Sequence, residues 1–212
     1  FTPHPKPMKN LFKILVFSLF SFIFCEESIE YYETGEISGR GTLKEGKKDG
    51  KWTEYYQNGQ IRVESNYKDG KEIGKWTYYF ENGQIRIEKN YKDGKMDGKD
   101  IWYYENGHIG WEENWEDGKI EGKWTYYYQD GRIRMERNHK DGQRDGKEVW
   151  YYKNGQISYE GNYENGKEIG KWTYFNEDGS LIIKKDTLHN DFEIIAKTDK
   201  DIIMGISHKK FN

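Results

Sequence analysis

The segment 75–95 contains two short runs of aromatic and β-branched residues that flank Asn82-Gly83. Apolar and polar side chains alternate in these runs, and a period of two predicts strands rather than a helix. Asn-Gly is favoured in a two-residue type I′ hairpin turn, in which both residues have positive φ. We therefore predict a β-hairpin here, followed by a second turn at Asp93-Gly94.

A two-residue turn at 82–83 also predicts the register, pairing 81 with 84, 80 with 85, 79 with 86 and 78 with 87. One face of the hairpin then carries the apolar and aromatic side chains Trp76, Tyr78, Phe80, Ile85 and Ile87. The other face carries the mixed set Thr77, Tyr79, Glu81, Gln84, Arg86 and Glu88. An antiparallel sheet with one covered face and one solvated face has this distribution.

The same unit recurs every 24 residues, which marks a tandem repeat. Three glycine ladders keep this spacing, beginning at Gly35, Gly46 and Gly50. We predict an all-β fold, an elongated antiparallel β-meander of tandem 24-residue hairpin repeats over residues 31–183. Each unit is too small to bury its aromatics alone, so stability must come from stacking.

Tryptophan follows a longer pattern within the repeats. Trp52, Trp76, Trp124 and Trp172 open their strands, whereas two units carry Asp100 and Glu148 there and place the indole two residues later, at Trp102 and Trp150. A shift of two keeps the indole on the same face of a strand.

The two ends of the chain leave the repeat. Residues 184–212 are expected to cap the sheet edge, either as a hairpin turning at Asp199-Lys200, which we favour, or as a helix. We expect translation to start at Met8, which makes residues 1–7 an upstream extension that is not native. Residues 8–25 combine lysines with the apolar run 14–24 and resemble a secretory or lipoprotein signal, with Cys25 as the candidate lipid attachment site.

Composition limits the classes of function. The net charge is −3, with acidic residues among the lysines of every repeat, so no basic face for nucleic acid is expected. One cysteine allows no internal disulfide. The five histidines have no zinc-ligand spacing and are expected on the solvated surface, and we predict no metal and no cofactor. A glutamate column at 64, 88, 112, 136 and 160 is expected to pair with Lys, Arg or Thr across strands.

The run 74–85, Gly-Lys-Trp-Thr-Tyr-Tyr-Phe-Glu-Asn-Gly-Gln-Ile, followed by Glu-x-Asn-Tyr-Lys-Asp-Gly-Lys, resembles the MORN repeat. It is more similar to the variant found in bacterial YwqK-family antitoxin repeat proteins. The resemblance covers residues 31–183 and implies an extended antiparallel sheet that binds proteins or lipids, without catalytic residues. The antitoxin family implies that the chain neutralises a partner toxin inside the cell.

The aromatic columns are the candidate binding residues, although the same residues also form the cohesive face of the sheet. They are Trp52, Trp76, Tyr78, Trp102, Trp124, Tyr126, Trp150 and Trp172. An exposed aromatic patch marks an interaction surface.

We therefore expect an exported, non-enzymatic scaffold that binds a protein partner and associates with a membrane through its N-terminus. The alternatives are a cell-surface module for carbohydrate or choline, which aromatic cages hold, and a cytoplasmic antitoxin. The sequence does not indicate the oligomeric state.

Overall fold

The computed structural model describes residues 25–186, 191–198 and 201–206, and every regular element in these ranges is a β-strand. The chain divides into two compact units, Phe1–Gly107 and His108–Asn212. The expected signal segment before Cys25 lies outside the described residues. An all-β antiparallel architecture built of successive hairpins confirms the predicted fold class.

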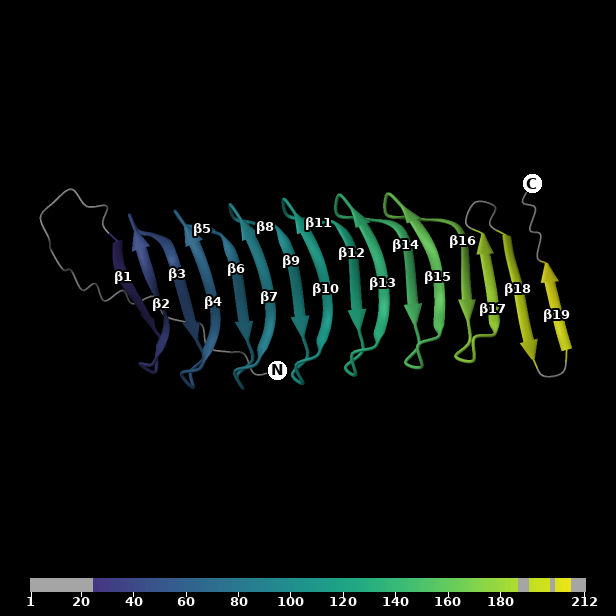
Figure 1. Ribbon diagram of the computed structural model, residues 1–212, viewed down its shortest axis with the longest axis horizontal. Coiled ribbons are helices and arrows are strands. Elements are labelled where there is room, and N and C mark those ends of the chain that lie inside the picture. Colours follow the sequence, from purple (N-terminus) through teal and green to yellow (C-terminus); the bar gives the residue numbers. More distant parts are fainter. Residues whose placement is uncertain (1–24, 187–190, 199–200, 207–212) are drawn as a thin grey trace, which may run out of the picture. The chain divides into compact units, whose positions relative to one another are not determined.

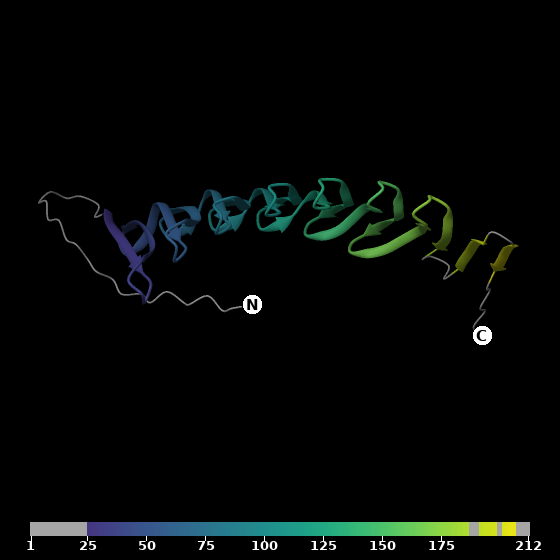
Figure 2. The ribbon, with the colours of Figure 1, turned by 90° about the horizontal axis from the view of Figure 1, so that it is seen from below.

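In the first unit, consecutive strands pair antiparallel as a meander (Figure 1). Its strands are β1 (Cys25–Tyr31), β2 (Ile37–Lys44), β3 (Lys47–Tyr55), β4 (Ile61–Lys68), β5 (Lys71–Glu72), β6 (Gly74–Tyr79), β7 (Ile85–Lys92), β8 (Lys95–Met96) and β9 (Gly98–Tyr103). Figure 2 shows these strands nearly end-on, in a single layer.

The second unit repeats this arrangement. Its strands are β10 (Ile109–Glu116), β11 (Lys119–Ile120), β12 (Gly122–Tyr127), β13 (Ile133–Lys140), β14 (Gln143–Tyr151), β15 (Ile157–Glu164), β16 (Lys167–Phe175), β17 (Leu181–Asp186), β18 (Asp191–Thr198) and β19 (Asp201–Ile206). The pairing of Thr198 with Asp201 confirms the terminal hairpin that we favoured over a helix.

The Asp-Gly turns are two-residue turns in which both residues have positive φ. Asp93 has a φ of 52° and Gly94 one of 85°, and Lys92 pairs with Lys95 across the turn. This is the type I′ geometry. The tip also bonds to the preceding repeat, since the Gly94 amide donates to the Glu72 carbonyl at 2.9 Å.

The Asn-Gly turns differ from our prediction. Gly83 has a φ of 81°, but Asn82 is not among the residues with positive φ, so the turn is not type I′. The Phe80 amide donates to the Gln84 carbonyl, and the Gly83 amide donates to the Phe80 carbonyl. These bonds close a three-residue loop whose last residue is a left-handed glycine. The Asn82 side chain accepts from the Gln84 amide at 3.0 Å, an Asx contact that stabilises this loop.

A bulge follows each of these turns and changes which residues share a face. Tyr78 pairs with Ile87 as predicted, but Tyr79 pairs with Ile85, which leaves Arg86 as an extra residue. Our placement of Ile85 with Tyr78 was therefore wrong, since Ile85 lies on the Tyr79 face and is 37% exposed. Arg86 was also misplaced, because its guanidinium lies over the Phe80 ring, 5.7 Å from the centroid.

A second irregularity lies at the third glycine ladder. The pairing of β4 shifts by two residues between Tyr67↔Glu72 and Glu64↔Thr77. Gly74 has a φ of 61° within the bulged segment. The Asn66 side-chain amide donates to the Lys75 carbonyl at 3.1 Å and so satisfies a backbone acceptor that the ladder leaves unpaired.

Tryptophans at the strand starts lie in a row across each unit, between small or charged neighbours. Trp52 is 1% exposed and pairs with Gly41 and Ser65. Trp172 is 2% exposed and lies against Gly161. A one-layer sheet buries an indole in this way only when the adjacent strand leaves room for it.

Ion pairs occupy this row where the tryptophan has moved two places. In the first unit Lys89 Nζ lies 3.6 Å from Asp100 Oδ2, and in the second Arg137 Nε lies 3.1 Å from Glu148 Oε2. Asp100 and Glu148 are both buried. The indole of Trp150 donates to Glu148 Oε1 at 2.7 Å. Each buried acid thus faces a base on the neighbouring strand, as its desolvation requires.

Tyrosines after the hairpin strands connect successive repeats. The Tyr56 hydroxyl donates to the Tyr79 carbonyl at 2.6 Å, and the Tyr152 hydroxyl donates to the Phe175 carbonyl at 2.7 Å. Tyr32 and Tyr128 make the equivalent bonds. Phe80 occupies the same position and has no hydroxyl.

Gly161→Ala is expected to destabilise the second unit by about 1–3 kcal/mol, the usual cost of overpacking. A Cβ at this position would lie 2.2 Å from Trp172 Cδ2, and a buried indole has little room to move. Urea unfolding measures the change. In a Trp172→Leu background the same substitution should cost clearly less; an equal cost in both backgrounds would contradict the proposed clash.

Tyr56→Phe is expected to lower the free energy of unfolding by about 1 kcal/mol, because it removes one hydrogen bond between repeats. Phe80→Tyr is the matched gain-of-contact variant and should raise stability, since it restores the hydroxyl at the one substituted position of the first unit. Thermal and urea unfolding of both variants check this pair. A Phe80→Tyr variant less stable than the parent would show that the position does not accept the bond.

Candidate functional site

In the first unit a straight row of paired residues crosses the sheet on the face of Tyr78. Successive backbone pairings join Glu30, Gly39, Glu54, Val63, Tyr78 and Ile87. Because paired residues point to the same side, their side chains form one surface from β1 to β7. The glutamates lie at one end of this row and Ile87 at the other.

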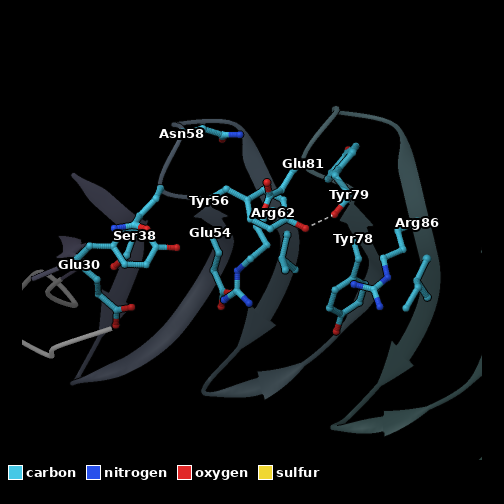
Figure 3. Close-up of a pocket in the computed structure, with 14 residues that line it drawn as sticks. Glu30, Ser38, Glu54, Tyr56, Asn58, Arg62, Tyr78, Tyr79, Glu81 and Arg86 are labelled. Atoms are coloured by element: carbon cyan, nitrogen blue, oxygen red, sulfur yellow. Dashed lines mark hydrogen bonds and ion pairs between the residues drawn. The ribbon is translucent and has the colours of Figure 1, made fainter. Parts of the chain in front are cut away.

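The bulge residues Ser38, Arg62 and Arg86 lie beside this row and border a hollow of about 430 Å³, the groove of the first unit (Figure 3). Glu54, Arg62, Tyr78 and Arg86 extend into it from β3, β4, β6 and β7. The bulges therefore place basic side chains on a face that a regular ladder would leave without them.

Aromatic rings form the walls of the groove and are held by hydrogen bonds. Tyr32 and Tyr56 line it, and their hydroxyls donate to the carbonyls of Tyr55 and Tyr79. Burial raises the pKa of Tyr78, with a further contribution from its neighbour Tyr91. A raised pKa keeps the Tyr78 phenol neutral at physiological pH, so its ring offers an uncharged surface.

Charged groups in the groove are only partly paired with one another. Arg62 Nη2 lies 2.5 Å from Glu54 Oε2. Within the described part of the chain no carboxylate pairs with Arg86 and no cation pairs with Glu30. The Ser38 hydroxyl is a third unpaired group, since it is buried and has no hydrogen-bond partner among the described residues. A buried polar atom without a partner is costly, which makes this hydroxyl a candidate ligand contact.

Arg134 of the second unit is equivalent in the repeat to Arg86 but has different contacts. Arg134 lies over three rings, 5.3 Å from the centroid of Tyr126, 5.6 Å from Tyr128 and 5.9 Å from Trp150. Its cation is thus held within its own unit by cation–π contacts. Arg86, by contrast, is exposed and lies over a single ring.

The structure assigns different roles to the eight predicted binding aromatics. Trp52, Trp76 and Trp172 are buried within the sheet and do not line the groove. Tyr78, Trp102, Trp124, Tyr126 and Trp150 are half-buried. Of the eight, Tyr78 alone lines the groove. Cys25, the candidate lipid attachment site, is exposed at the first position of β1.

The opposite face of the sheet carries a repeated Lys–Glu–Tyr row. In the first unit Lys51 Nζ lies 2.6 Å from Glu64 Oε1, and the Tyr79 hydroxyl donates to Glu64 Oε2 at 2.8 Å. Lysine pairing recurs at Glu88, Glu136 and Glu160, which confirms the predicted pairing of the glutamate column. The tyrosine partner was not predicted. These charges satisfy one another, in contrast to those of the groove.

The histidines only partly follow the prediction. His108 is exposed, and its Nδ1 lies 2.7 Å from the Gln129 carbonyl oxygen. His139 was expected on the surface but is 8% exposed, with its ring 5.8 Å from Trp124. Burial lowers its pKa, and the cations of Arg137 and Arg144 lower it further. In the described ranges no group of three or more His, Cys, Asp or Glu residues is arranged to hold a metal ion.

Sequence reasoning missed Glu30, Ser38 and Arg86 as groove residues. Arg62 and Arg86 recur with the 24-residue period, but the assumed two-residue turn assigned them to the wrong face. Ser38 occupies the arginine position of the first repeat, so only the bulge geometry connects it to the groove.

Comparison with known proteins identifies the repeats. The family model described as MORN repeat variant matches residues 48–69, 72–93, 120–141 and 144–165. The chain thus contains MORN-variant repeats in both units, which is consistent with a scaffold for protein or membrane binding. No helix in the described residues has the length and hydropathy needed to span a bilayer.

The comparisons with curated proteins and with solved structures add no further family assignment. No curated protein matches the chain. Among solved structures, a chain of "Crystal structure of GtfA/B complex bound to UDP and GlcNAc" is similar at 12% identity with a TM-score of 0.18. The match covers 57% of this chain and 22% of that one.

The Glu64 carboxylate is expected to make stability depend on pH. The Lys51 ammonium lowers the pKa of Glu64 below 4.5, helped by the Tyr79 hydroxyl. A depressed folded-state pKa stabilises the fold above the unfolded value, and this contribution is lost as pH falls through the folded value. Urea unfolding should therefore show lower stability at pH 3 than at pH 6.

Glu64→Gln is the control for this prediction, because it keeps the shape and removes the titration. Its stability should change less between the two pH values than that of the parent. High salt should also shrink the difference, since Glu64 is partly exposed. An identical pH dependence in parent and variant would contradict a role for this row.

Proposed function

We propose that this chain is a non-enzymatic repeat scaffold that binds another protein through the groove of the first unit. The observation that carries the proposal is the contrast between the two faces. On the face of Glu64, carboxylates, ammonium groups and phenols pair with one another. On the groove face, Glu30 and Arg86 have no oppositely charged partner within the described chain, beside rings held in fixed positions.

Such a surface suits protein recognition. Tyrosine and arginine are enriched at the centres of protein interfaces, where rigid rings bury area at low entropic cost. The unpaired charges then supply orientation and specificity. The MORN-variant match supports a scaffold of this kind.

We further propose that the scaffold is exported and held at a membrane surface through its N-terminus. The apolar run 14–24 and the exposed Cys25 at the start of β1 support this location. The sequence resemblance to YwqK-family antitoxins makes a toxin one class of partner, and the identity of the captured protein decides between this class and others.

Site-specific photocrosslinking tests the face that binds. A photoreactive amino acid at position 62 lies in the groove, whereas one at position 85 lies on the opposite face of the same unit. In cells that make the protein, position 62 should give a discrete protein adduct and position 85 should give little. Equal adducts at both positions, or adducts at position 85 alone, would argue against the groove.

Cys25→Ser should move the protein from the membrane fraction to the aqueous fraction if this residue carries the lipid anchor. Metabolic labelling with a fatty acid should mark the parent chain and not the variant. Ser28→Ala, on the same strand, is a control that keeps the cysteine. Unlabelled parent chain in the aqueous fraction would remove lipid anchoring from the proposal.

A further inference from the structure

The groove of the first unit is polarised along its length. At the β1–β2 end lie the Glu30 carboxylate and the Ser38 hydroxyl, with Glu54 next in the same row. At the β7 end lies the Arg86 guanidinium. Glu54 is already paired with Arg62, and Glu81 lines the groove from the loop after β6, outside this row. Along the row and its bulges, the groups without a partner in the described chain are Glu30 and Ser38 at one end and Arg86 at the other.

The acidic end is suited to the ammonium or guanidinium group of a side chain. Glu30 Oε2 lies 3.3 Å from the position that a Cβ of Gly39 would occupy, so the carboxylate lies over this glycine beside Ser38. The Ser38 hydroxyl is buried, lines the groove and has no partner among the described residues. An N–H donor could bond to both oxygens, and the neighbouring rings of Tyr32 and Tyr56 also favour a cation.

The Arg86 end is suited to a carboxylate. Arg86 is exposed, and its ring contact with Phe80 leaves the N–H groups of the guanidinium available at its edge. A guanidinium edge matches a carboxylate with two parallel hydrogen bonds. At the equivalent position in the second unit, Arg134 is enclosed by three rings, so Arg86 is the more accessible of the two.

The two ends are separated by a length that an extended peptide can span. β2 and β7 are joined by four successive pairings, β2–β3, β3–β4, β4–β6 and β6–β7. At ~4.8 Å per strand this is about 19 Å, and an extended chain covers it with about six residues at ~3.3 Å each.

We propose that the groove binds an extended segment of the partner protein that carries a basic side chain and an acidic side chain about six residues apart. The basic group contacts Glu30 and Ser38, and the acidic group contacts Arg86. The segment crosses the strands and lies along the row of Glu54, Val63 and Tyr78. This inference rests on the proposed function and specifies the partner's chemistry and orientation.

Selection from a random dodecapeptide display library on the purified full-length chain tests the inference. Enriched peptides should share Lys or Arg at about six positions from Asp or Glu. Peptides selected on the Glu30→Gln variant should no longer be enriched in Lys or Arg but should still be enriched in Asp or Glu. Peptides selected on the Arg86→Gln variant should keep the enrichment in Lys or Arg and lose that in Asp or Glu. Enriched peptides without the charge pair, no enrichment at all, or the same peptides on both variants would overturn the proposal.

Fluorescence anisotropy with one enriched peptide measures how much each variant weakens peptide binding. Glu30→Gln and Arg86→Gln should each weaken binding about tenfold or more, the usual effect of losing a charged hydrogen bond. Arg132→Gln, an exposed arginine of the second unit, is the matched control and should leave binding unchanged. Binding that both groove variants leave intact would contradict the inference.

Ser38→Ala separates a ligand contact from a structural role. Removing an unsatisfied hydroxyl should leave the thermal midpoint unchanged or raise it, while peptide binding weakens several-fold. Unchanged binding would show that the Ser38 hydroxyl does not contact the peptide and would remove it from the site. If the peptide results contradict the charge pair but position 62 still gives crosslinks, only this inference is overturned. If the peptide results contradict it and position 62 gives no crosslinks, the proposed function is overturned as well.

Discussion

Each of the two units depends on how a single layer of strands covers its own aromatic side chains. With no second layer over the described strands, each indole is buried by residues of its own strand and of the adjacent strands. Trp52 and Trp172 reach almost complete burial because glycine or serine lies beside them. Where the row carries Asp100 or Glu148, a lysine or arginine replaces the packing contact with an ion pair. Neighbours in the row must therefore match in size or in charge, which ties each repeat to the next.

The bulge after each Asn-Gly turn connects this architecture to recognition. A regular two-residue hairpin would keep Arg86 on the polar face, where the Lys–Glu–Tyr rows would surround it. The extra residue turns its side chain to the aromatic face and opens the groove beside the bulges. Backbone geometry set by one glycine at positive φ thus decides the chemistry of a surface several residues away.

Much of the fold could be predicted from the sequence because periodicity and turn chemistry are local signals. The 24-residue period, the Asp93-Gly94 turn and the shared face of Trp76 and Tyr78 all follow from them. The Asn-Gly turn could not be predicted, because Asn82 also suits a three-residue loop through its side-chain contact with the Gln84 amide. The two turns differ by one residue, and that residue inverts the faces of Ile85 and Arg86. The groove was therefore missed although its arginines are periodic.

The functional surface arises where repeats depart from one another. A strictly periodic face would present the same contacts every 24 residues and would hold a partner in several equivalent registers. The groove column instead reads Glu30, Glu54 and Tyr78, and the bulge column beside it reads Ser38, Arg62 and Arg86. These differences place Glu30 at one end of the row and Arg86 at the other, so a partner segment has one favourable register and direction. Positions that keep the same residue in every repeat maintain the scaffold, and positions that differ between repeats form the distinct binding site.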